Sequence, residues 1–265
     1  MKKGLLISAL LLLYNGYSQD SIVNYLDGSS HKIKNKDKAL YIQSLVKKNN
    51  VWEIKKYNRI GKILSSGSFD NILKDSPSGT HKTFFRNGVL TSQVHYNDKG
   101  NIDGLYKRWF YNGKLDYYGH YKDGKKVGIW KYYHMNGKIG CRIYYQDGKP
   151  IKTLLYDEDG LKIEEELIEF RKPQFKGGNK LFGKRISKIH NFVGFQVNGR
   201  LYLDFVIDNN GLITDITSLS KIPRELLLKI KTFLKNTKGW SPAISMNRKI
   251  PYFYYFPLEF RVIFD

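Results

Sequence analysis

Cysteine and proline are scarce in this sequence. Cys141 is the only cysteine among 265 residues, so an intramolecular disulfide is impossible. No recognisable His or Asn motif accompanies this thiol, and we interpret it as a packed strand residue rather than a nucleophile. Seven prolines are too few for a long proline-rich spacer. The chain is long enough for two modest domains, whose stability must come from their own cores.

Acidic residues are few relative to basic ones. The chain has 24 Asp and Glu against 45 Lys and Arg, a formal net charge of +21. This charge favours anionic partners: nucleic acid, lipid headgroups, lipopolysaccharide or an acidic protein. Many lysines, however, recur at equivalent positions of the repeats described below, where they serve solubility at strands and turns. No recognition helix or RNA-binding sheet motif accompanies the charge, so we expect no nucleic-acid partner.

Motifs of catalysis and of metal binding are missing. The six histidines show no H-E-x-x-H or Cys-His spacing, and no G-x-S-x-G, phosphate-binding loop or dinucleotide fingerprint occurs. His95 and His120 occupy the same repeat position, which repetition explains without a metal. The turn at 208–211 lacks the distal glutamate of a calcium loop. We therefore predict a non-enzymatic protein with no catalytic, cofactor-binding or metal site.

Long hydrophobic runs are confined to the start of the chain. Lysines at positions 2 and 3 precede an apolar run over residues 4–13, and the small residues Gly16 and Ser18 follow. This pattern predicts a cleaved signal peptide over residues 1–18 and an exported protein, periplasmic or associated with the outer membrane. The alternative is an uncleaved inner-membrane anchor facing the periplasm, although Asn15 interrupts the run. Only that alternative predicts contact with a membrane.

Three copies of one aromatic pattern occupy the middle of the chain. Each copy begins with Gly, ends with Asn-Gly, and carries Tyr, Trp or Phe between them. The copies start 25 and then 24 residues apart, at positions 79, 104 and 128. A fixed period of this length indicates a repeat architecture.

Turn signals separate the strands expected in each copy. Asn-Gly and the Asp-Gly pairs at 123–124 and 147–148 tolerate the positive φ angles of tight hairpin turns. The aromatic segments between them suit strands. Successive hairpins are therefore predicted to form one continuous antiparallel sheet. Strand alternation places aromatic residues on both faces: Trp109 and Tyr133 on one, and Tyr106, Phe110, Trp130 and Tyr132 on the other.

The pattern G-x-x-x-x-[WFY]-[YF]-x-N-G-K-L, followed by Y-x-[DN]-G, resembles the bacterial MORN-variant repeat, which also occurs in YwqK-type antitoxins. An earlier, degenerate copy at 57–69 aligns with 109–121. The resemblance covers about residues 51–150, and we assign 51–160 to a MORN-like sheet. It implies a β-meander that serves as an interaction surface.

The segments on either side of the repeats extend this sheet. Residues 19–50 are expected to cap its first edge, as repeat proteins require. Strands are expected at 22–26, 39–46 and 51–57, although a helix over 39–48 remains an alternative. After the last copy, 152–156 is expected to close the sheet. Residues 161–172 are predicted to be an exposed charged connector that is partly helical.

A second domain is expected over residues 173–265. Apolar segments at 201–207 and 213–219 flank a turn and predict a hairpin. An apolar stripe at helical spacing predicts a helix over 223–235. The last strand, 252–264, contains Pro257, which is typical of a sheet edge. The predicted fold class is mainly β, or α+β: a repeat β-meander plus a small β-β-α-β domain.

This second domain resembles the C-terminal domain of TonB in its Bacteroidetes form. The motifs that carry the resemblance are F-[VI]-[VI]-D-x-x-G-x-[VI]-T-D-[VI] at 205–216, W-x-P-A at 240–243 and P-x-F-x-G-G at 173–178. The resemblance implies a small sheet with a helix on one face. It also implies binding of an extended peptide from an outer-membrane transporter by strand addition. Carried over, that role falls on Tyr252, Phe253, Tyr254, Tyr255, Phe256, Leu258, Glu259, Phe260 and Arg261.

Two departures from TonB limit this comparison. The usual Tyr-Pro-x-x-Ala stretch is replaced at 189–195, and the repeats stand where the proline-rich spacer should be. We therefore predict an exported cell-envelope binding or scaffold protein with a protein or peptide partner, such as an outer-membrane TonB-dependent transporter. One alternative is an antitoxin-like or structural repeat protein. Another is a membrane-anchored energy transducer for transmembrane transport.

Overall fold

The computed structural model describes residues 20–72, 76–187, 199–218 and 222–260. The expected signal peptide, all of residues 189–195 and Arg261 lie outside these residues. The chain divides into two units. One contains residues 1–88 and 95–101, and the other contains residues 89–94 and 102–265.

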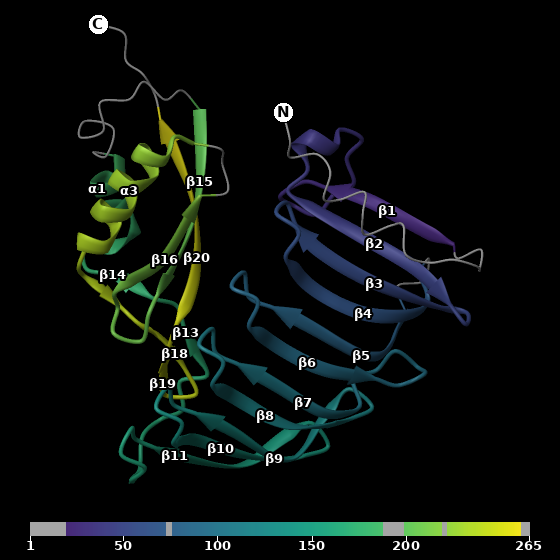
Figure 1. Ribbon diagram of the computed structural model, residues 1–265. Helices are drawn as coiled ribbons and strands as arrows, with labels where there is room; N and C mark the ends of the chain where they lie inside the picture. Colours follow the sequence, from purple (N-terminus) through teal and green to yellow (C-terminus); the bar gives the residue numbers. More distant parts are fainter. Residues whose placement is uncertain (1–19, 73–75, 188–198, 219–221, 261–265) are drawn as a thin grey trace, which may run out of the picture. The chain divides into compact units, whose positions relative to one another are not determined.

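The repeats and their flanking segments form one antiparallel sheet in which twelve strands follow in sequence order (Figure 1). This is the predicted β-meander, and residues 39–48 contribute a strand rather than a helix. A short 3₁₀ turn, η2, covers Lys36–Lys38. The strands are β1 (Ser21–Leu26), β2 (Tyr41–Lys48), β3 (Val51–Asn58), β4 (Ile63–Asn71), β5 (Ser76–Phe84), β6 (Leu90–Tyr96), β7 (Gly104–Trp109), β8 (Leu115–Lys122), β9 (Lys125–Tyr133), β10 (Ile139–Gln146), β11 (Lys149–Tyr156) and β12 (Lys162–Ile163).

The Asp-Gly turns of the meander have the predicted backbone geometry, whereas in the Asn-Gly turns only the glycine has a positive φ. Gly113 and Gly137 of the Asn-Gly turns adopt φ angles of 82° and 92°. In the turn between β8 and β9, Asp123 and Gly124 have φ angles of 46° and 79°. Positive φ at both central residues matches the twist of two adjacent antiparallel strands. The turn residues therefore determine where each strand ends.

The sheet continues beyond the segment expected to close it. β12 pairs with the end of β11, so Tyr156 is not in the last strand. Residues 164–169 contain no helix, and the next element is β13 (Phe170–Arg171). The prediction of partial helix was wrong here for two reasons. Leu167 packs against aromatic side chains of the sheet, and the main-chain oxygens of Ile168 and Glu169 accept hydrogen bonds from the N–H groups of Asn247 and Met246. These contacts favour an extended chain over a local helix.

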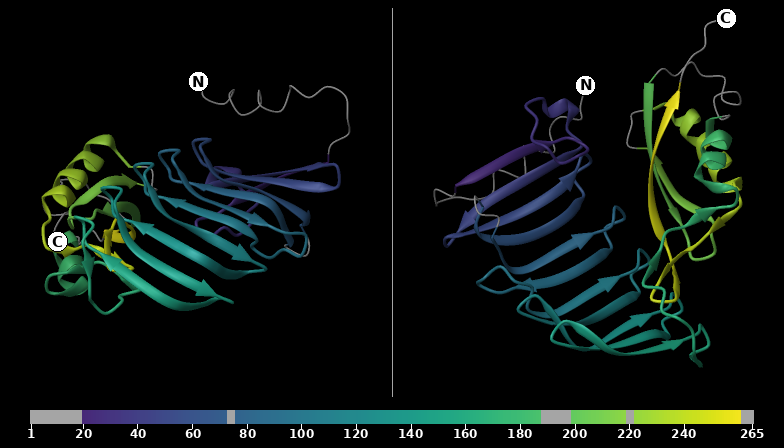
Figure 2. Two further views of the ribbon diagram at one scale, coloured as in Figure 1. Left: turned by 90° about the horizontal axis from the view of Figure 1, so that it is seen from below. Right: turned by 180° about the vertical axis from the view of Figure 1, so that it is seen from behind.

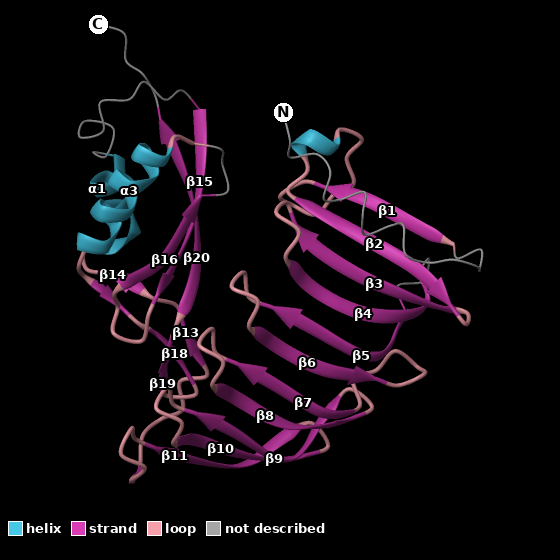
Figure 3. Ribbon diagram, viewed as in Figure 1, coloured by secondary structure: helices cyan, strands magenta, loops and turns pink. Residues whose placement is uncertain are grey.

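The C-terminal part contains the predicted hairpin, helix and final strand, together with elements that the sequence did not predict. Figure 3 shows that the α-helices found among the described residues lie in this part. Three small sheets have the strand orders β13-β18-β19, β14-β17 and β16-β15-β20. The elements after β13 are β14 (Gln174–Phe175), α1 (Gly178–Ser187), β15 (Gly199–Ile207), β16 (Ile213–Ser218), α3 (Arg224–Asn236), β17 (Trp240–Ser241), β18 (Ala243–Ser245), β19 (Arg248–Ile250) and β20 (Tyr252–Phe260).

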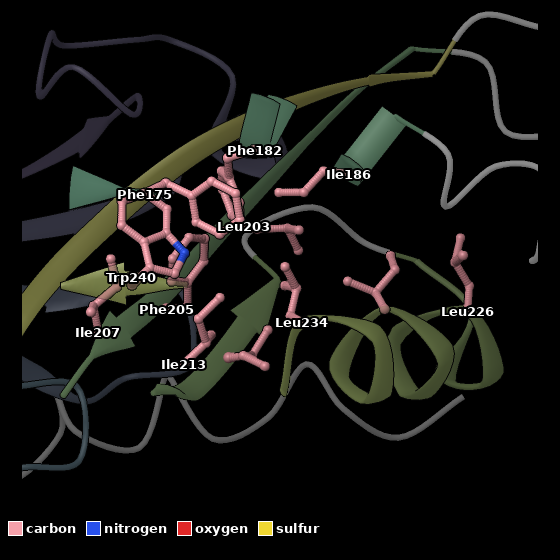
Figure 4. Close-up of a cluster of buried hydrophobic side chains, with 12 residues drawn as sticks. Phe175, Phe182, Ile186, Leu203, Phe205, Ile207, Ile213, Leu226, Leu234 and Trp240 are labelled. Atoms are coloured by element: carbon pink, nitrogen blue, oxygen red, sulfur yellow. The ribbon is translucent and has the colours of Figure 1, made fainter. Parts of the chain in front are cut away.

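A hydrophobic core (Figure 4) joins α1 and α3 to one face of the β16-β15-β20 sheet, the face on which the helix ribbons lie in Figure 2. Leu226, Ile230 and Leu234 recur every four residues along α3 and are fully buried. From α1, Phe182 and Ile186 enter the same core. A fully buried side chain of this size contributes roughly 1.5–3 kcal/mol. The core therefore packs against one face of the sheet, whereas the edges of the sheet remain for other interactions.

Candidate functional site

The strand expected to bind a peptide lies at a sheet edge. β20 is the last strand in the order β16-β15-β20. It pairs with β15 over nine residues, from Ile207 opposite Tyr252 to Gly199 opposite Phe260. Eight of the nine residues proposed from the sequence belong to this strand. Pro257 lies within it opposite Tyr202, as expected for an edge strand.

Alternating side chains anchor the first half of β20. Tyr254 stacks on Phe205, with ring centroids 5.4 Å apart, and its ring lies 5.3 Å from that of Trp240. Burial raises the pKa of Tyr254. Phe253, the next residue in the alternation, is 50% exposed. Tyr254 thus attaches the start of the strand to the core, whereas the neighbouring Phe253 is half exposed.

A tight hairpin leads into β20. β18 and β19 are joined by Met246 and Asn247, whose φ angles of 50° and 58° fit a two-residue hairpin turn. Arg248 is the first residue of β19. Only residues 249–251 separate it from Tyr252, where β20 begins.

Arg248 is buried against the repeat sheet and is only 1% exposed. Its Nη1 donates hydrogen bonds to Asp116 Oδ1 at 2.7 Å and to the main-chain oxygens of Asp116 and Tyr133. The guanidinium also lies 5.3 Å from the centroid of the Tyr132 ring. Asp116 is itself 5% exposed, and Arg108 approaches its other oxygen at 3.6 Å. The two buried charges therefore compensate each other.

Two β-bulges create the socket that receives Arg248. The pairing of β7 with β8 skips Asp116, and the pairing of β9 with β10 skips Gly140. A bulge redirects the side chain of the extra residue. A Cβ at Gly140 would lie 2.7 Å from the side-chain carbons of Arg248 and 2.6 Å from Nε2 of His134. The arginine stem therefore fits only because residue 140 is glycine.

Beside the socket, the chain covers an aromatic cluster of its own repeats. Tyr106, Trp130 and Tyr132, which were predicted to share a face, belong to this cluster, and Cys141 is completely buried in it. Leu167 and Met246 pack against the same side chains. The remaining members are Tyr117, Tyr121, Ile143, Tyr145, Leu155 and Ile163.

Asn247 connects the hairpin turn to the segment that contains Leu167. The main-chain N–H of Ile168 donates to Asn247 Oδ1 at 2.6 Å. Asn247 Nδ2 donates to the carbonyl of Glu166 at 3.0 Å and to Oε2 of Glu165 at 3.2 Å. The turn is therefore held both by the sheet and by residues 165–168.

A second surface combines basic and tyrosine side chains. Tyr118 is paired with Lys107 on one side and with Lys131 on the other, and Lys131 is paired with Arg142. These residues form a row across four strands. Lys131 lies 5.6 Å from the centroid of the Tyr118 ring, and a hydrogen bond from Lys131 lowers the pKa of Tyr118. Asp116 is the only acid in β7 to β11, and it binds Arg248, so the row has the charge for an anionic partner.

The one cysteine thiol is buried. Burial raises the pKa of the Cys141 thiol to about 12, which suppresses the reactive thiolate. No three His, Cys, Asp or Glu side chains among the described residues are grouped to hold a metal ion. In the same residues, no helix combines the length and hydropathy needed to cross a membrane.

Sequence reasoning identified the edge strand but missed the socket. Arg248 and Asp116 lie 132 residues apart, so no local pattern connects them. One signal was available: Asp116 is the only acid in the strands β7 to β11 and follows an Asn-Gly turn. An isolated acidic side chain among basic and aromatic strands requires a charged or hydrogen-bonded partner if it is buried.

Comparison with known proteins supports the repeat assignment. The family described as MORN repeat variant matches residues 77–98 and 102–123, which span β5 to β8. No curated protein sequence matches the chain. Repeats of this family generally mediate interactions with proteins or membranes and occur in non-enzymatic binding or scaffold proteins. Residues 77–123 thus carry MORN-variant repeats, which suggest a protein-interaction or scaffold role.

Proposed function

We propose that this chain is an exported cell-envelope protein that binds an extended peptide by adding it as a strand to β20. The position of β20 at the end of the order β16-β15-β20 carries the proposal. The motifs at 205–216 and 240–243, which resemble TonB, favour a peptide from an outer-membrane transporter. The repeat sheet then acts as the scaffold that supports the binding domain.

Strand addition uses the two properties that β20 combines. An incoming strand forms main-chain hydrogen bonds along the edge, each with a net contribution of about 1 kcal/mol. Alternate side chains of the edge strand supply selectivity. Here Tyr254 is committed to the core, whereas the ring of Phe253 is half exposed. The strand can therefore select a peptide without leaving its own sheet.

The decisive test changes the peptide backbone and leaves the protein intact. Peptides from the periplasmic N-termini of the host's outer-membrane transporters are titrated against the full mature chain. Peptides that bind are then made in two N-methylated forms. One phase carries methyl groups on the odd-numbered main-chain nitrogens, and the other phase carries them on the even-numbered ones. We expect one phase to abolish binding and the other to preserve it, because only alternate N–H groups face β20. Equal effects in both phases would exclude strand addition.

Location is tested independently. Mass spectrometry of the mature N-terminus in fractionated host cells is expected to find a chain that starts near Gln19 outside the inner membrane. An intact Met1 in the inner-membrane fraction would instead support the anchored energy transducer.

A second candidate function is binding of an anionic partner on the row formed by Lys107, Tyr118, Lys131 and Arg142. The absence of acidic side chains other than Asp116 from β7 to β11 favours it. This scaffold role corresponds to the antitoxin-like or structural alternative. Reversing the charge of Lys131 and Arg142 is expected to release such a partner and to leave peptide binding at β20 unchanged. Retention of the partner by that variant would rule the surface out.

A further inference from the structure

We propose that Arg248 is a positioning residue for the peptide-binding edge, so that the repeat sheet controls the affinity of β20. This inference rests on the proposed function. It assigns to the Asp116–Gly140 socket a role that neither the repeat family nor the TonB resemblance supplies. The socket holds the β18–β19 turn and thereby fixes the point at which β20 starts.

Chain connectivity provides the first step. Arg248 begins β19, and Tyr252 begins β20 four residues later. Four residues span at most about 14 Å even when fully extended, and Pro251 restricts the backbone further. A shift of Arg248 therefore moves the start of β20, because little slack separates them.

The contacts of the turn provide the second step, because they hold it from different directions. Arg248 is fixed by Asp116 and by the carbonyl of Tyr133. Asn247 is bonded to residues 165–168, and Met246 packs on the aromatic cluster. Three consecutive side chains are thus committed to three separate sets of partners. Such a turn has one defined position relative to β8, β9 and β10.

The energetics favour positioning over stabilisation. A buried ion pair often contributes little net stability, because desolvation offsets the attraction, whereas removing one partner is costly. Within the described residues, Nε of Arg248 is also buried without a hydrogen-bond partner. A contact selected for stability alone would avoid such a group. The arrangement instead suits a contact that defines one geometry.

The test compares two variants that weaken the Asp116–Arg248 ion pair with a control variant whose substituted side chain does not touch the β18–β19 turn. Asp116→Asn removes the charge at constant shape, and Arg248→Lys keeps the charge but loses the planar fork. Arg108→Gln is the matched control, because Arg108 approaches the same carboxylate from an exposed position. Hydrogen exchange is measured on the full mature chain without peptide, and peptide affinity is measured separately with the transporter-derived peptides.

Among the Tyr252–Tyr254 amides, we expect exchange of those that donate to β15 to accelerate about tenfold in Asp116→Asn and Arg248→Lys, while the amides of α3 keep their rates. Peptide affinity should fall by a similar factor, about tenfold. Arg108→Gln should change both quantities less than twofold. A merely structural pair would accelerate exchange throughout the C-terminal part, including α3.

The inference is overturned if a folded Asp116→Asn variant retains wild-type exchange at Tyr252–Tyr254 together with wild-type affinity. It is also overturned if both variants lose all structure, since the pair is then part of the general core. If the wild-type chain binds none of the peptides, the proposed function fails. Exchange at β20 still decides whether Arg248 positions the strand.

Discussion

Asp116 and Arg248 lie 132 residues apart in the sequence, and their charged groups meet at 2.7 Å where both side chains are almost fully buried. The aspartate belongs to a repeat strand, and the arginine belongs to the hairpin that precedes the final strand. This pair makes the C-terminal hairpin dependent on the repeats.

Replacement of the socket glycine should destabilise the protein. In Gly140→Ala, the new methyl group would overlap the Arg248 stem and His134, and we expect a loss of about 1–3 kcal/mol in the free energy of unfolding. Urea denaturation monitored by circular dichroism measures this loss. Gly183→Ala is the control, because a Cβ there meets no atom within 4 Å and alanine favours the helix. Equal stabilities of the two variants would contradict the steric argument.

Loss of the central aromatic ring should be costlier still. Trp130 is 1% exposed, and its ring lies 5.0 Å from Tyr121, edge to face. Trp130→Ala is expected to cost about 3–5 kcal/mol by removing this packing. Trp109→Ala, at a half-buried position, should cost less. Thermal unfolding of both variants checks the order, and a reversed order would show that the cluster around Trp130 is not the stabilising one.

Alkaline pH should destabilise the fold through Cys141. Burial raises the pKa of its thiol from 9.0 to about 12, so the folded chain retains a proton that the unfolded chain releases. The unfolded state therefore binds fewer protons above pH 9, and stability falls as pH rises from about 9 towards 12. Cys141→Ala should show a shallower fall over this range. Urea midpoints measured at several pH values test this, and identical slopes would contradict it.

The basic row should tune the ionisation of Tyr118. A hydrogen bond from Lys131 is the main cause of the lowered pKa of Tyr118. Lys131→Met is therefore expected to raise that pKa, since the bond favours the phenolate. Ultraviolet absorbance titration against a Tyr118→Phe reference measures it. Lys107→Met should have a smaller effect, because Lys107 acts only at a distance. A larger change in the pKa of Tyr118 in Lys107→Met than in Lys131→Met would contradict this assignment.

The repeat sheet is predictable from sequence because its signals are local. Asn-Gly and Asp-Gly mark each turn, and residues such as Gly113 and Gly124 adopt the positive φ that these pairs permit. The apolar stripe Leu226, Ile230 and Leu234 likewise indicates α3. In both cases the information lies within about ten neighbouring residues.

Elements that depend on distant contacts escape such reasoning. β17 to β19 contain two or three residues each, which is too short for a hydrophobic period to develop. In α1, only Phe182 and Ile186 are buried aliphatic or aromatic residues, and Gly183 lies between them. The socket requires two bulges and an arginine from another part of the chain. The sequence shows the chemical type of these residues, but it does not show that they come into contact.

The meander also determines where this protein tolerates changes in length. Each strand from β1 to β12 pairs only with its sequence neighbours in the sheet order, so a whole hairpin can be gained or lost without rewiring the others. Asp116 and Gly140, however, lie one repeat apart and must stay on strands separated only by β9. An inserted copy between them would break the socket. Growth and shrinkage of the sheet are therefore excluded between β8 and β10.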